Sequence, residues 1–354
     1  MNDNVAPFDA LTRAACKAGP VRVAVADAAQ KVVMETLRDA ERTGLATPLL
    51  VGDPNAIRTI AADLGWTVAQ DAIIAAADDA EAAARVVALV REGRADVVMK
   101  GNLHTDIFMR ALLDKNLGLR LPGQRVSHVF VVTLPGHERL LGITDAAINI
   151  APNLTAKAQI CQNAVDLFRM LGVVRPKVAV LSAVETVTAD IASTLDAACL
   201  TLMSRRGQIT GAEVDGPLAL DNAISARAAT GKGILSDVAG SADILLVPDL
   251  VSGNILAKTL EYLAGGVAAG IAIGLAAPVV LTSRADPAPA RLAALAIAAL
   301  MHHRRPQVEP LLETAKNSIA AAPQPEDACR PLPAVTNLQP LPVSLPPQFR
   351  ESTQ

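Results

Sequence analysis

Aromatic side chains are scarce in this chain of 354 residues: they make up 2% of it, although apolar residues make up 51%. Its cores must therefore be built from Ala, Val, Leu and Ile, whose small side chains suit close packing of helices on sheets. A chain of this length can form two domains with separate cores. These properties predict an α/β protein.

Cysteine is also rare, and no two of the four cysteines have a C-x-x-C or metal-binding spacing; they are Cys16, Cys161, Cys199 and Cys329. Scattered thiols favour a reducing cytoplasm over a disulfide framework and give no indication of a metal site. The first ten residues, MNDNVAPFDA, lack the apolar core of a secretory signal. We therefore expect a cytoplasmic protein.

The chain has no excess of basic residues, since its formal net charge is −3. This argues against nucleic acid as a partner. It does not argue against a small anionic ligand, because a few well-placed arginines are enough to bind one.

One stretch lacks charge altogether, from Ala264 to Leu281. It approaches the length of a membrane span, but it contains four glycines and Pro278 and is dominated by alanine. We predict a buried helix followed by a strand here, and no membrane association.

Alternating strand and helix patterns run along the chain and restart after Asn153. They predict two α/β units on a mainly parallel sheet. The first domain is expected to be discontinuous, with residues 1–152 and 277–320, and the second to span 153–276. Ten of the 23 prolines lie between Pro306 and Pro347, so residues 321–354 are predicted to be a poorly ordered tail.

Residues 231–286 suggest where ligands bind. The apolar run Ile244–Val247 predicts a buried strand, Ser252 a helix cap, and Pro278–Leu281 a second strand. A strand–helix–strand crossover places both strand tips at one edge, where ligands bind in open α/β sheets. The polar residues expected to share a cleft there are Asp249, Ser252, Asn254, Ser283 and Arg284.

The same region resembles the phosphate acetyltransferase and phosphate butyryltransferase family, through ADILLVPDLVSGNILAK and PVVLTSRAD. Further similar segments follow in the order expected of one alignment: ADVVMKGNLHTDIFMRALL, VSHVFVV, LLGITDAAINIAPNL, AVETV, VDGPLALDNAIS and GKGILSDVAG. The forms MKG, SH and ITDAAINIAP are closer to the butyryl branch. The resemblance covers roughly residues 20–305.

This resemblance implies reversible transfer of a short acyl group, acetyl or butyryl, between coenzyme A and inorganic phosphate in a ternary complex. It also implies a homodimer of two-domain subunits with an interdomain cleft, like the isocitrate and isopropylmalate dehydrogenases. Coenzyme A is then a substrate, and no metal or other cofactor is implied. The residues do not fix the length of the acyl chain.

Catalytic roles follow from the resemblance for three residues. Ser283 would hydrogen-bond the coenzyme A sulfur, and the planar guanidinium of Arg284 would bind phosphate and the carbonyl oxygen. Asp286 is either the base for the thiol or the cap of the helix that follows it, because the acetyl-type members carry their aspartate further along the loop.

The resemblance also assigns substrate-binding residues, to Lys100, Gly101, His104, Thr105 and Arg110 in the first domain and to Asp249, Ser252, Gly253, Asn254 and Lys258 in the second. Ordinary alternatives exist for several of them. Ser252 can simply cap a helix, Lys258 can be a solvated lysine, and His104 can be a satisfied loop histidine. Asp145, at the hinge between the domains, is expected to order the cleft rather than to perform chemistry.

Three other functions remain as alternatives. A dehydrogenase on the same scaffold would need a cluster of metal-binding aspartates and a nicotinamide site, and neither pattern is evident. An acyl-carrier-protein phosphate acyltransferase would use related acyl phosphate chemistry. A non-catalytic protein that binds acyl-CoA or phosphate is the third alternative, and a weakened enzyme becomes plausible if Asp286 is only a cap.

Overall fold

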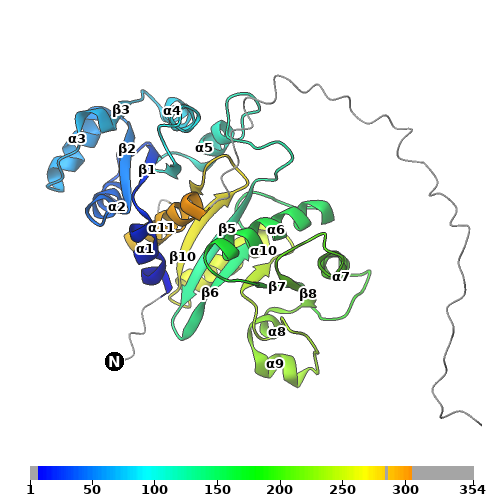
Figure 1. Ribbon diagram of the computed structural model, residues 1–354. Coiled ribbons are helices and arrows are strands. Elements are labelled where there is room, and N and C mark those ends of the chain that lie inside the picture. The colour runs from blue at the N-terminus through cyan, green and yellow to red at the C-terminus, as the bar shows by residue number, and fades with distance from the viewer. Residues whose placement is uncertain (1–6, 284–285, 305–354) are drawn as a thin grey trace, which may run out of the picture. The chain divides into compact units, whose positions relative to one another are not determined.

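The computed structural model describes residues 7–283 and 286–304 of the chain (Figure 1). Its helices are α1 (Pro7–Ala18), α2 (Lys31–Arg42), α3 (Pro54–Asp63), α4 (Asp79–Arg91), α5 (Thr105–Leu112), α6 (Leu154–Met170), α7 (Ala192–Arg205), α8 (Leu220–Ile224), α9 (Ala226–Gly231), α10 (Leu250–Tyr262) and α11 (Ala288–Arg304). Its strands are β1 (Val21–Ala26), β2 (Ala46–Gly52), β3 (Ile73–Ala75), β4 (Val97–Lys100), β5 (Ser127–Leu134), β6 (His137–Thr144), β7 (Lys177–Leu181), β8 (Glu213–Leu218), β9 (Ile244–Leu246), β10 (Val267–Ile273) and β11 (Val279–Val280).

The strands form one sheet in the order β3-β2-β1-β4-β11-β10-β5-β6-β9-β7-β8. Strands β3, β2, β1, β4 and β11 pair in parallel, as do β6, β9, β7 and β8. Between these two groups, β10 and β5 make antiparallel pairs. The predicted α/β class with a mainly parallel sheet is therefore confirmed.

The uncharged stretch Ala264–Leu281 contains no helix, so the predicted buried helix is wrong. It forms strand β10, a turn and strand β11. A Cβ atom at Gly270 would lie 3.0 Å from Nε2 of His128 and 3.3 Å from the Phe130 ring. Strand β10 lies in the crowded middle of the sheet, which leaves room only for small side chains. This explains the glycines and alanines that suggested a packed helix.

Strands β9 and β11 run in opposite directions, because three antiparallel pairings separate β11 from β6, and β6 is parallel to β9. The prediction that their two tips share one edge is therefore wrong. The two regions meet in another way. Helix α10 runs back from the end of β9, and its side chains at Asn254 and Lys258 line the same cleft as the end of β11.

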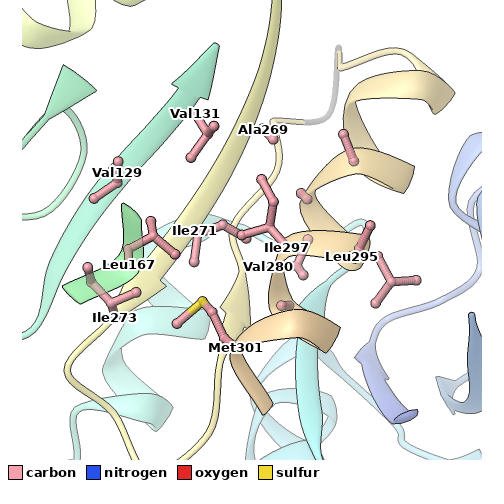
Figure 2. Close-up of a cluster of buried hydrophobic side chains, with 14 of the residues drawn as sticks. Val129, Val131, Leu167, Ala269, Ile271, Ile273, Val280, Leu295, Ile297 and Met301 are labelled. Carbon is pink, nitrogen blue, oxygen red and sulfur yellow. The ribbon is translucent and has the colours of Figure 1, made fainter. Parts of the chain in front are cut away.

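Helix α11 provides much of the core. It is apolar around almost its whole circumference, and eleven of its seventeen residues are buried, as expected of a helix enclosed by other elements. Figure 2 shows Leu295, Ile297 and Met301 of this helix beside Ile271 of β10 and Val280 of β11. This packing fixes the start of α11 next to the residues that follow β11.

None of the described helices is long and apolar enough to cross a membrane. The predicted boundaries between two domains, at 152/153 and 276/277, stay a prediction. The predicted tail, residues 321–354, and the predicted end of the first domain at 320 lie outside the described residues.

Candidate active site

A cleft of about 420 Å³ lies where the β4–α5 turn, strand β5, helix α10 and the end of β11 come together. Six of its lining residues are among the predicted site residues: Lys100, His104, Thr105, Asn254, Lys258 and Ser283. Six more are not: Leu103, His128, Phe130, Ala147, Leu281 and Thr282. The lining thus combines polar side chains, such as Lys100 and Ser283, with apolar ones, such as Leu103 and Phe130.

Lys100 ends strand β4 and is only 2% exposed. Its Nζ lies 3.4 Å from the carbonyl oxygen of Gly101. Lysines are rarely buried to this extent, so the cleft has in its wall an amine that is largely shielded from water.

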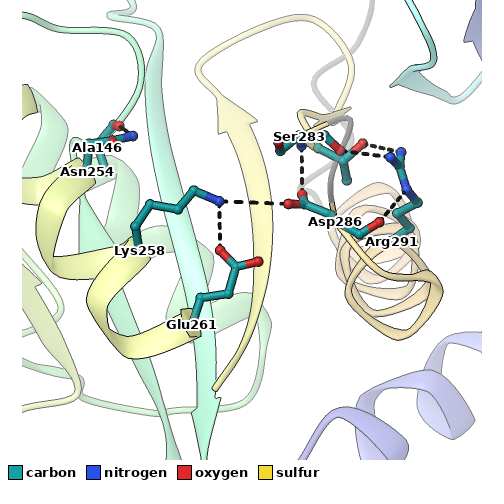
Figure 3. A network of polar contacts seen from close by, with 8 residues as sticks. Ala146, Asn254, Lys258, Glu261, Ser283, Asp286 and Arg291 are labelled. Atoms are coloured by element: carbon teal, nitrogen blue, oxygen red, sulfur yellow. Dashed lines mark hydrogen bonds and ion pairs between the residues drawn. The ribbon is translucent and has the colours of Figure 1, made fainter. Parts of the chain in front are cut away.

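The turn after β11 carries two of the three predicted catalytic residues. The main-chain N–H of Ser283 donates to Oδ2 of Asp286 at 2.7 Å (Figure 3). Asp286 is 4% exposed, and its recorded carboxylate bond runs back into the turn. The third predicted catalytic residue, Arg284, lies outside the described residues.

Arg291 of helix α11 holds this turn and was not among the predicted residues. Its guanidinium donates to Oγ1 of Thr282 at 2.9 Å and to the carbonyl oxygens of Ser283 at 2.8 Å and Asp286 at 3.1 Å. The whole side chain is buried. A single arginine inside the apolar run APARLAALAIAALM was the signal available in the sequence, because a buried arginine needs polar partners.

Lys258 connects helix α10 to the turn. Its Nζ lies 2.7 Å from Oε2 of Glu261 and 3.9 Å from Oδ1 of Asp286 (Figure 3). It also lies 5.4 Å from the centre of the Tyr262 ring. The lysine is thus held by its neighbours at the rim of the cleft rather than freely solvated.

Burial raises the pKa of Asp286 above its ordinary value. The Ser283 N–H and the positive charges of Lys258 and Arg291 oppose this effect, whereas the negative charge of Glu261 adds to it. A carboxylate whose pKa is moved toward neutrality is better suited to accept a proton near neutral pH.

His128 and Phe130 line the cleft from strand β5. Their rings meet edge to face with centroids 4.5 Å apart. Burial lowers the pKa of His128 to about 4, against the smaller opposing effects of the Asp145 charge and of a contact with the main chain of Leu281, so the imidazole is neutral near pH 7. Among the described residues, neither of its ring nitrogens has a partner with good hydrogen-bond geometry.

The polar start of helix α10 differs from the prediction. Asp249, not Ser252, is the N-cap: Oδ1 of Asp249 accepts the N–H of Ser252 at 2.8 Å, and the Ser252 hydroxyl bonds back to Asp249. A carboxylate suits this position because it also faces the positive end of the helix dipole. Neither residue lines the cleft described above.

Gly253 and Asn254 fit helix α10 against the loop after β6. A Cβ atom at Gly253 would lie 2.8 Å from the carbonyl oxygen of Asp145, so only glycine permits this approach. Nδ2 of Asn254 donates to the carbonyl oxygen of Ala146 at 3.3 Å. Gly253 is thus a packing residue here, whereas Asn254 both packs and lines the cleft.

Two predicted residues of the first half lie away from the cleft wall. A Cβ atom at Gly101 would overlap the carbonyl oxygen of Asp27, so this glycine allows the ends of β1 and β4 to meet. Arg110 is largely exposed, with its guanidinium 3.8 Å from the Asp106 carboxylate.

Asp145 follows strand β6 and orders the loop behind the cleft. Its carboxylate accepts the N–H groups of His128, Ala147 and Ile148 at 2.9–3.1 Å and the side-chain amide of Asn149 at 2.6 Å. The loop between β6 and α6 is thereby tied to strand β5, which carries His128.

Known proteins are similar in sequence to this chain over most of its length. Residues 69–299 match the phosphate acetyl/butaryl transferase family. A phosphate acetyltransferase of Rhizobium meliloti is 49% identical over 298 residues, which are 84% of this chain and 94% of that protein. The chain belongs to this family.

Both named branches of the family are similar to it. A phosphate butyryltransferase of Clostridium acetobutylicum is 45% identical over 280 residues, 79% of this chain and 93% of its own length. The crystal structure of a branched-chain phosphotransacylase from Enterococcus faecalis V583 superposes with a TM-score of 0.69 at 28% identity, covering 80% of this chain and all of that one. The sequence comparison and the structure comparison thus confirm the acyltransferase family and the fold that the motifs predicted.

Proposed function

We propose that this acyltransferase-family chain transfers a short acyl group, acetyl or butyryl, reversibly between coenzyme A and inorganic phosphate. The observation that carries this proposal is the meeting of Ser283 with Lys100 and Lys258 in one cleft, beside the buried Asp286 carboxylate. Two cationic side chains suit anionic substrates, and the apolar side chains of Leu103 and Phe130 suit an acyl chain.

In the direction of acyl-CoA synthesis, the coenzyme A sulfur attacks the carbonyl carbon of an acyl phosphate. A carbon–sulfur bond forms, the carbon–oxygen bond to phosphate breaks, and phosphate leaves with the electron pair. The thiol proton passes to the Asp286 carboxylate, whose raised pKa supports this role. Both substrates must be bound together for this direct transfer, so the reaction runs through a ternary complex.

Ser283 is proposed to hydrogen-bond the coenzyme A sulfur, and Arg284 to bind phosphate and the carbonyl oxygen that becomes negative. The cationic Lys100 and Lys258 are proposed to attract the phosphate groups, with His104, Thr105 and Asn254 as hydrogen-bonding groups of the wall. Gly101, Asp249, Ser252 and Gly253 support this site through packing and capping. We propose no metal or other cofactor for the reaction.

A homodimer in the cytoplasm is proposed as the working form. Helix α10 supports the dimer, since Val251, Ile255 and Tyr262 project from it and are 60–63% exposed, together with Leu263 at 83%. An exposed apolar stripe of this kind often marks a protein–protein contact. The molar mass of the wild type and of Ile255→Glu, measured by light scattering, tests this proposal. We expect a dimer for the wild type and a weaker dimer for Ile255→Glu, because the introduced charge would lie in the contact.

The reaction is tested by release of free coenzyme A from acetyl-CoA and butyryl-CoA, with and without phosphate. Release that requires phosphate, with acyl phosphate as the second product, is expected. Release without phosphate, reduction of a nicotinamide, or acyl transfer only to or from an acyl carrier protein would each contradict the proposal. Acyl-CoA binding without turnover would identify a non-catalytic protein.

A further inference from the structure

The guanidinium of Arg291 is buried in helix α11, beside the turn that carries Ser283 and Asp286. The rest of helix α11 is apolar where it is buried, and burying a charge costs several kcal/mol. Its recorded hydrogen-bond partners are neutral oxygens of Thr282, Ser283 and Asp286. An apolar side chain would avoid that cost, but it would remove the donors to the Thr282 hydroxyl and to the carbonyl oxygens of Ser283 and Asp286.

The three acceptors belong to residues that follow β11 (Val279–Val280), and Figure 3 shows two of them, Ser283 and Asp286, beside Arg291. The same turn is closed from inside by the N–H of Ser283 on the Asp286 carboxylate and by the N–H of Asp286 on the Ser283 carbonyl. The planar, forked guanidinium can reach acceptors on both sides of the turn at once, whereas a lysine ammonium can meet only a point. The arginine therefore fixes the spacing between the Ser283 and Asp286 main chains.

We propose that Arg291 is a positioning residue for acyl transfer: it holds Ser283 and Asp286 in the arrangement in which they act on the coenzyme A thiol. This inference rests on the proposed function. Arg291 does not bind substrate itself, because it is buried and its donors are directed into the turn. It acts on the reaction through the turn.

Electrostatics add a second consequence. The charged groups recorded around the Asp286 carboxylate are Lys258 and Glu261 of helix α10 and Arg291 of helix α11. The Arg291 charge favours the ionised carboxylate and lowers its pKa, against the raising effect of burial and Glu261. Without this charge the pKa of the carboxylate is higher. A reaction that needs the ionised carboxylate then loses rate at a less acidic pH as the pH is lowered.

The test compares Arg291→Met and Arg291→Lys with wild type. A misplaced catalytic group costs on the order of 100-fold in rate, so we expect kcat to fall by about 100-fold in Arg291→Met while the KM for acyl-CoA changes less than about threefold. The acidic limb of its pH–rate profile should move to higher pH. Arg291→Lys keeps the charge without the fork, so its acidic limb should stay in place although kcat falls.

A matched control is Lys157→Met. Lys157 is another buried basic residue, 6% exposed, and its Nζ on helix α6 lies 2.7 Å from the Asp196 carboxylate on helix α7, away from the cleft. Its loss should lower stability without moving kcat or the pH profile. Equal effects of the two methionine variants on kcat, or an unchanged kcat in both arginine variants, would overturn the proposal.

Hydrogen exchange separates failure of this inference from failure of the proposed function. The amides of Ser283 and Asp286 should exchange at least tenfold faster in Arg291→Met than in Lys157→Met, whether or not the protein is active. Unchanged exchange would refute the claim that Arg291 holds this turn in place. A wild type without phosphate-dependent transfer would refute the proposed function, and with it the catalytic part of this proposal, even if the exchange result holds.

Discussion

Asp286 can be tested with two substitutions that separate its chemistry from its part in the turn. Asparagine keeps an oxygen that can accept the N–H of Ser283, but it cannot take up the thiol proton. Alanine removes both functions. Because a positioned general base contributes about 10²–10⁴-fold in rate, both variants should lose at least about 100-fold in kcat.

Their stabilities should differ. The bond from the Ser283 N–H to the carboxylate is short, 2.7 Å, and partly buried, and a hydrogen bond to a charged group is worth about 1.5–3 kcal/mol. Asp286→Ala should therefore lower the free energy of unfolding by roughly 2 kcal/mol. Lys258 keeps its partner Glu261 and adds little to this loss.

Asp286→Asn should change stability by less than about 1 kcal/mol near neutral pH, because its amide oxygen can still accept the N–H of Ser283, whereas alanine offers no acceptor. The pKa of this carboxyl is raised in the folded state. Protonation therefore favours folding, and the stability it contributes is lost as pH rises through the folded pKa.

The assays are steady-state acyl transfer with both substrates saturating and urea unfolding of each variant. A kcat of Asp286→Asn above one tenth of the wild-type value would refute Asp286 as the base. A loss of stability without any loss of rate in Asp286→Ala would leave it as a purely structural residue.

Arg284→Ala should lose most turnover, about 10²–10³-fold in kcat, because it removes a donor to the developing oxyanion; wild-type turnover would remove this residue from the mechanism. Phe130→Leu should enlarge the cleft and raise the butyryl-to-acetyl ratio of kcat/KM about tenfold, as measured with a series of acyl-CoA donors; an unchanged ratio would place the acyl chain elsewhere. His128→Leu should leave the free energy of unfolding within about 1 kcal/mol of wild type or raise it, since two buried nitrogens without good partners are removed; a loss above 3 kcal/mol in urea unfolding would show that they are satisfied.

The sequence was sufficient for the class of fold and for the region of the site, because both rest on local patterns. Alternating apolar runs predict strands and helices, and the chain-long order of motifs predicts the family. The strand β10, where a helix was predicted, could not be found from such local patterns. A Gly- and Ala-rich stretch suits a packed helix and a crowded central strand equally well, and the close approach of the Leu281 carbonyl, His128 and Phe130 to Gly270 is seen only in the folded sheet.

The site was predicted in part for a similar reason. Polar residues at strand ends, such as Lys100 and Ser283, stand out in a sequence and do line the cleft. Arg291 does not stand out, since it lies in a helix after the motif and reaches the turn only through the packing of α11. His128 was part of a matched segment, but its burial beside Phe130 depends on strand pairing between β5 and β10, which spacing alone does not reveal.

The most direct test of the account is a crystal structure of the protein with coenzyme A and phosphate bound. The account predicts the coenzyme A sulfur within hydrogen-bonding distance of Ser283 or Asp286, and phosphate in the cleft on the side of Lys100 and Lys258. Coenzyme A bound elsewhere, with this cleft empty at saturating substrate, would contradict it.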